Sequence, residues 1–152
     1  MSTKLKSLEN IQLTGEQING EFVSCTGIQL IRILGAIRDF LNDSDWYISD
    51  ISTNNSVSGL FSIENSNLPL KVGNIDKLIQ LTTQVDQFLS GIFLCVPSSI
   101  QNPTWSRNFD TEDEPTEDLE DALIEIRAFD TTCFEIYTSN STWIQSLLNS
   151  FS

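Results

Sequence analysis

The stretch DTEDEPTEDLED, residues 110–121, contains the side chains of this sequence that are best suited to binding or acid–base chemistry. Clustered carboxylates can hold a divalent metal ion, act as an acid–base pair, stay solvated in a loop or attract a cationic partner. Eight of the twelve residues are carboxylates and none is a cation: Asp110, Glu112, Asp113, Glu114, Glu117, Asp118, Glu120 and Asp121. We call these eight side chains the acidic run.

The spacing of the acidic run resembles a calcium loop only in part. An EF-hand loop needs oxygen ligands at positions 1, 3, 5 and 12 and a glycine at position 6. Asp110, Glu112, Glu114 and Asp121 match the ligand positions, but Pro115 occupies position 6 and cannot make the required turn. The flanking segments TWSRNF and ALIEI do not have the pattern of paired helices. We therefore predict no metal site.

The chain lacks the residues on which most catalytic sites depend. It contains no histidine, which removes the commonest general base and zinc ligand and every Ser-His or Cys-His pair. Its seven glycines are scattered singly, so there is no phosphate-binding loop. Cys25, Cys95 and Cys133 are widely spaced in apolar segments and are interpreted as reduced core residues. With 21 acids, some pair of carboxylates will lie close by chance, so that pattern is not specific. We predict no enzyme activity, no catalytic residues and no cofactor.

The charge of the chain is uneven along its length. The net charge is −13, and residues 108–152 hold eleven acids and one base, a net −10, which leaves −3 for residues 1–107. Such a surface repels nucleic acids and anionic membranes and attracts a cationic protein. A solvated loop is the plain alternative for an acidic block, and both interpretations stay open.

Aromatic side chains adjoin the acidic run. Trp105 precedes it and Phe109 touches it, and aromatic residues beside charges are typical of interface hot spots. The alternative is that both rings pack beneath the loop. The candidate partner-binding residues are therefore Trp105 and the eight acids of the acidic run.

Hydrophobic periodicity predicts the elements that must position these residues. Residues 98–121 read as one long acidic loop, and residues 1–20 as either a loose arm or a first strand. The segment 88–97 is apolar in both alternating registers, which fits a central strand covered on both faces. Helices are expected over 26–42, 74–87 and 141–151, and strands over 45–51, 60–64, 70–73, 88–97 and, as a hairpin, 122–139.

This order predicts a single domain over residues 1–152, of class α/β or α+β. The expected architecture is one mixed or antiparallel sheet with about three helices packed against it. The polar start MSTKLKSLEN has no apolar core of a secretory signal, and no apolar run is long enough for a membrane helix. A cytoplasmic location is expected.

Two segments carry a family resemblance: IQLIRILGAIRDFLNDSDWYI and LIEIRAFDTTCFEIYTSNSTWIQSLL. Together they resemble small uncharacterised bacterial α/β domains and, more loosely, the single-domain immunity proteins of toxin–immunity systems. The resemblance covers about a third of the chain. It implies a small acidic protein that binds and blocks a cognate toxin domain, and it brings no catalytic residues.

The sequence therefore predicts an immunity protein that covers the active site of a cationic toxin domain, most simply a basic nuclease, with an acidic surface. It predicts no direct binding to nucleic acid or membrane. Two alternatives remain: an acidic mimic of DNA that inhibits a nucleic-acid-binding enzyme, and a non-catalytic interaction domain without a toxin partner.

Overall fold

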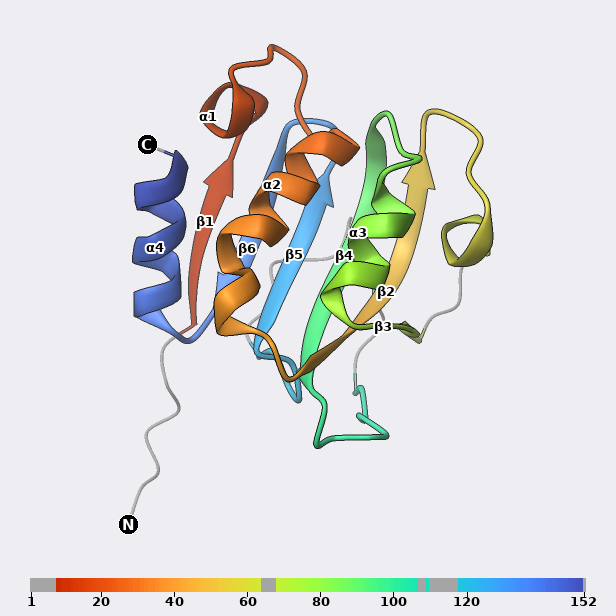
Figure 1. Cartoon of the computed structure of the whole chain (residues 1–152), viewed down its shortest axis with the longest axis vertical. Coiled ribbons are helices and arrows are strands. Elements are labelled where there is room, and N and C mark those ends of the chain that lie inside the picture. The colour runs from red at the N-terminus through yellow and green to blue at the C-terminus, as the bar shows by residue number, and fades with distance from the viewer. Residues whose placement is uncertain (1–7, 64–67, 107–108, 110–117, 152) are drawn as a thin grey trace.

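The computed structural model describes residues 8–63, 68–106, 109 and 118–151, and in them the chain forms one six-stranded antiparallel sheet with helices (Figure 1). The strand order is β1-β6-β5-β4-β2-β3. The strands are β1 (Glu9–Leu13), β2 (Ser44–Thr53), β3 (Leu70–Gly73), β4 (Phe88–Pro97), β5 (Ile124–Phe129) and β6 (Cys133–Thr138). The α-helices are α1 (Gly15–Asn19), α2 (Gly27–Ile37), α3 (Ile75–Thr82) and α4 (Ser141–Phe151), and two 3-10 turns are η1 (Arg38–Phe40) and η2 (Gly59–Ser62).

The three longer helices cover one face of the sheet, with α2 between α3 and α4 (Figure 1). Thr26 caps α2 in a reciprocal capping box with Gln29, and Asn74 caps α3 through the backbone N–H of Lys77. Fully buried Leu30 and Leu34 of α2 belong to the core cluster between the helices and the sheet. The predicted single sheet with helices against it is confirmed, and its strands pair antiparallel throughout.

Strand β4 lies inside the sheet, between β2 and β5, as its sequence pattern predicted. Phe93 and Cys95 face the helices, whereas Ile92 and Leu94 face the opposite side. The hairpin of β5 and β6 is also confirmed, because Ile126 pairs with Ile136 across it. We call the side of the sheet away from the three helices the second face.

Two expectations about the first half of the chain are resolved. Residues 9–13 form strand β1, which pairs with β6 at the sheet edge, so the strand alternative holds rather than the arm; residues 1–7 lie outside the described residues. The strand predicted over 60–64 was wrong: residues 59–62 form η2, with residues 64–67 outside the described part. A short turn suffices to bury Phe61, whose ring packs edge-on against Phe88 and Phe93.

Candidate partner-binding site

A second hydrophobic cluster lies on the second face and carries the candidate site. Tyr47, Leu94 and Tyr137 project to this face from β2, β4 and β6. Phe109 and Leu119 pack into the same cluster and are 5% and 7% exposed. These two residues flank positions 110–118 in the sequence, so the residues on either side of that stretch are packed on the second face.

Trp105 forms the aromatic part of the site. Its ring packs edge-on against Phe109, with ring centroids 5.3 Å apart, and against Tyr47 at 6.1 Å. Trp105 is half-buried, while Phe109 is buried. Phe109 therefore fits the alternative interpretation, in which the ring packs within the protein instead of contacting a partner. Trp105 packs on the cluster and is only partly buried, so its role in binding stays a prediction.

Glu120 and Asp121 hold the loop together. A carboxylate oxygen of Asp121 accepts a hydrogen bond from the backbone N–H of Thr104 at 3.1 Å. Glu120 Oε1 accepts one from the backbone N–H of Ser106 at 2.7 Å and a second from the Ser106 hydroxyl. Hydrogen bonds to an ionised acceptor are stronger than neutral ones. These two acids therefore fix the segment that carries Trp105 to the residues just before β5.

The structure describes four of the nine predicted site residues and brings three of them together. Asp121 and Glu120 bond to Thr104 and Ser106, the two residues that flank Trp105 in the sequence. Asp118 is exposed, and its carboxylate accepts a hydrogen bond from the backbone N–H of Glu120 at 2.8 Å. The remaining five acids lie outside the described residues: Asp110, Glu112, Asp113, Glu114 and Glu117.

A buried ion pair lies on the same face and was not singled out from the sequence. Arg127 Nε donates to a carboxylate oxygen of Glu125 at 2.6 Å, and the two side chains are 3% and 0% exposed. The guanidinium carbon of Arg127 lies 6.0 Å from the ring centroid of Tyr137. The Tyr137 hydroxyl donates to Glu135 at 3.1 Å. Side chains alternate along β5, so Glu125 and Arg127 share the face opposite Ile124 and Ile126. This alternation is the feature of the sequence from which the pair could have been predicted.

Burial changes the acidity of several groups around this sheet. It raises the pKa of Tyr137 to about 12, with the neighbouring carboxylate of Glu135 adding to the effect. Burial likewise raises the pKa of the Cys25 and Cys95 thiols to about 12. The three cysteines are free and buried, and none is prepared as a thiolate nucleophile.

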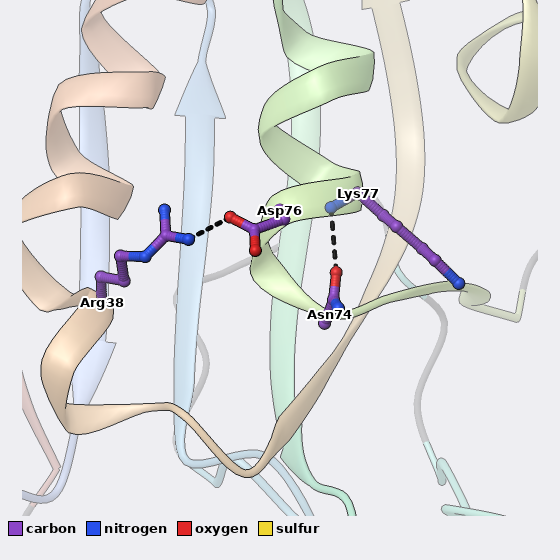
Figure 2. A network of polar contacts seen from close by, with 4 residues as sticks. All are labelled: Arg38, Asn74, Asp76 and Lys77. Atoms are coloured by element: carbon purple, nitrogen blue, oxygen red, sulfur yellow. Dashed lines mark hydrogen bonds and ion pairs between the residues drawn. The ribbon is translucent and has the colours of Figure 1, made fainter.

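The helix-covered side of the molecule presents ordinary surface pairs. Figure 2 shows Arg38, at the end of α2, reaching across to Asp76 in the first turn of α3. The two side chains are 43% and 64% exposed, so water screens their attraction. Within the described residues, no group of three His, Cys, Asp or Glu side chains is placed to hold a metal ion. In that same part of the chain, no helix is both long enough and apolar enough to cross a membrane.

Comparisons with protein-family models, curated proteins and solved structures gave no match. What the site can do must therefore come from its own side chains. A group of aromatic rings next to carboxylates, with a buried ion pair on the same face of the sheet, is suited to binding because hydrogen bonds and packing hold its side chains in place.

Proposed function

We propose that this protein is a single-domain immunity protein that works in the bacterial cytoplasm. It binds a cationic toxin domain, most simply a basic nuclease, and covers the groups that the toxin uses to hold phosphates. Lys and Arg side chains that bind phosphate also bind carboxylates, so an acidic surface competes directly for them. The absence of histidine agrees with a binding role rather than a catalytic one.

One observation carries this proposal: the acidic run is tethered at both ends to a rigid sheet. Phe109 and Leu119 are buried in one cluster, and Glu120 and Asp121 anchor the returning chain. A charged segment fixed at both ends loses less freedom on binding than a free tail does. The six remaining acids are the ones proposed to meet the partner: Asp110, Glu112, Asp113, Glu114, Glu117 and Asp118.

The test begins with the product of the neighbouring reading frame. Purified with this protein, it should form a tight 1:1 complex, and co-expression should protect cells from its toxicity. Binding without protection would indicate an interaction domain of another kind. Inhibition of several unrelated DNA-binding enzymes, with no preference for the neighbouring product, would favour the DNA-mimic alternative. The absence of any complex with that product would refute the proposal.

A further inference from the structure

The α1–α2 loop, residues 20–26, presents an almost fully exposed phenylalanine. Phe22 is 95% exposed, the adjacent Val23 is 49% exposed, and Ile28 in the first turn of α2 is 61% exposed. Single exposed apolar side chains are common and need no explanation, but these three lie within seven consecutive residues of the chain. Figure 1 places this loop at the end of the sheet where β4 begins, whereas Trp105 follows the other end of β4.

The loop is held rigidly in spite of this exposure. Gln29, which is fully buried, donates to the backbone oxygen of Val23 at 2.7 Å. Ser24 accepts from the backbone of Gly15 at 2.8 Å and from the side chain of Gln87 at 3.0 Å. A Cβ on Gly15 would lie 2.0 Å from the oxygen of Val23, so the loop packs directly on the start of α1.

The base of the loop is joined to the sheet as well. The backbone N–H of Phe88 donates to Cys25 at 2.7 Å, and the Cys25 thiol donates to the carbonyl oxygen of Cys133 at 3.1 Å. The backbone turns through left-handed conformations at Gly20 and Cys25, with φ of 77° and 64°. Cys25 is a non-glycine residue in this region, and such strain persists only where the surroundings hold it. The loop is thus built to keep one shape.

The segments that form and support the loop carry more acids than bases. The structure places the turn after α3 and the β5–β6 turn against the base of the loop, through Gly27 and Cys25. In the described residues 14–27, 83–88 and 129–133, which include both turns, there is no Lys or Arg, and the first base along α2 is the exposed Arg32, one helical turn after Ile28. Four acids lie in these segments: Glu16, Glu21, Asp86 and Asp130.

We propose that the α1–α2 loop is an anchor that inserts Phe22 into an apolar pocket bordered by Lys or Arg side chains on a partner protein. A rigid aromatic side chain suits the centre of an interface, because little conformational freedom is lost when it binds. The acids around it match a cationic rim and oppose contact with a second copy of this chain, whose net charge is −13. This surface is separate from the acidic run and does not depend on its role.

The test places the photoreactive amino acid benzoylphenylalanine at position 22 of the full chain, in cells of the source organism. The control carries it at position 148, because Leu148 is a 40% exposed apolar residue on α4. The expected result is one adduct from position 22 with a basic protein, mapped to an apolar site beside Lys or Arg, and no such adduct from position 148. The purified partner should then bind Phe22→Ala at least about 30-fold more weakly than wild type, and Leu148→Ala within about threefold.

Several outcomes would overturn the proposal. These are no adduct at position 22, the same adducts at positions 22 and 148, an adduct with a second copy of this chain or an acidic protein, or equal affinity for Phe22→Ala. Phe22 buries almost no surface, so Phe22→Ala should melt at the wild-type temperature. This result is distinguishable from failure of the proposed function, since Phe22→Ala leaves the acidic run intact.

Discussion

Replacing Glu125 by methionine should destabilise the protein strongly, because it leaves the buried guanidinium of Arg127 without its carboxylate. The two side chains are 0% and 3% exposed and 2.6 Å apart. Breaking such a pair by removing one partner costs about 3–5 kcal/mol. Glu135 lies opposite Arg127 across the β5–β6 pair and can relieve part of the loss, so we expect about 3 kcal/mol.

The double variant Glu125→Met with Arg127→Met should recover most of that stability. Apolar side chains of similar volume often replace a buried ion pair at little cost, so we expect it within about 1 kcal/mol of wild type. The exposed pair of Arg38 and Asp76 supplies the control, and Arg38→Met should cost less than about 1 kcal/mol (Figure 2).

Urea unfolding at neutral pH measures all three variants, and a shift of the midpoint at constant slope reports the change in stability. If Glu125→Met were no more destabilised than Arg38→Met, the buried pair would not have the energetic role assigned to it. A double variant as unstable as Glu125→Met would show that the loss came from packing rather than from the stranded charge.

Three further predictions concern glycines and titrating groups. Gly35→Ala on helix α2 should stabilise the protein by about 1 kcal/mol in the same urea assay, because nothing lies within 4 Å of the added Cβ. Gly27→Ala should destabilise the protein, because its Cβ would lie 2.3 Å from a backbone oxygen. Burial raises the pKa of the Cys25 and Cys95 thiols to about 12, so an aromatic disulfide reagent should react with them at pH 8 only after urea unfolds the chain, and rapid labelling of the native protein would contradict their burial. The pKa of Tyr137 is raised from 10.0 to about 12, so its contribution to stability is complete below pH 10 and is lost as pH rises towards 12. The stability of Tyr137→Phe should therefore fall less steeply than that of wild type between pH 10 and 12. Identical slopes of stability against pH for the two proteins would refute this.

Much of the fold could be predicted because local signals and tertiary packing agree there. Thr26 and Asn74, the first residues of the helices predicted over 26–42 and 74–87, cap α2 and α3. The strand that became β4 is apolar in both registers, and it is covered on both faces. Prediction failed where the same apolar pattern fits either a strand or a turn. The segment around Phe61 has the pattern of a strand, but it forms a 3-10 turn from which the Phe61 ring alone is buried, against Phe88.

The sequence analysis named the residues of the candidate site, but it did not show which of them form hydrogen bonds within the chain. Eight acids in sequence look alike, and composition cannot tell which of them are used internally. Glu120 and Asp121 hold backbone N–H groups because the chain folds back on itself there, a long-range event. The burial of Glu125 and Arg127 also depends on packing on the second face, which strand periodicity alone does not reveal. The α1–α2 loop was missed because exposure of a phenylalanine leaves no mark in the sequence.

The measurement that tests the central claim most directly is the rate of association with the proposed toxin partner, sought in the product of the neighbouring reading frame, at low and at high salt. The variant carries amides at Glu112, Asp113 and Glu114. A control of equal charge neutralises three exposed acids elsewhere: Glu9, Asp39 and Asp76.

We expect wild-type association to slow by about tenfold or more as salt rises, because long-range attraction is screened. The amide variant should associate more slowly at low salt and show a flatter salt dependence, while the control stays close to wild type. Both variants should keep the wild-type melting temperature to within a few degrees. Equal rates and equal salt slopes for wild type and the amide variant would contradict the claim that the acidic run forms the binding surface.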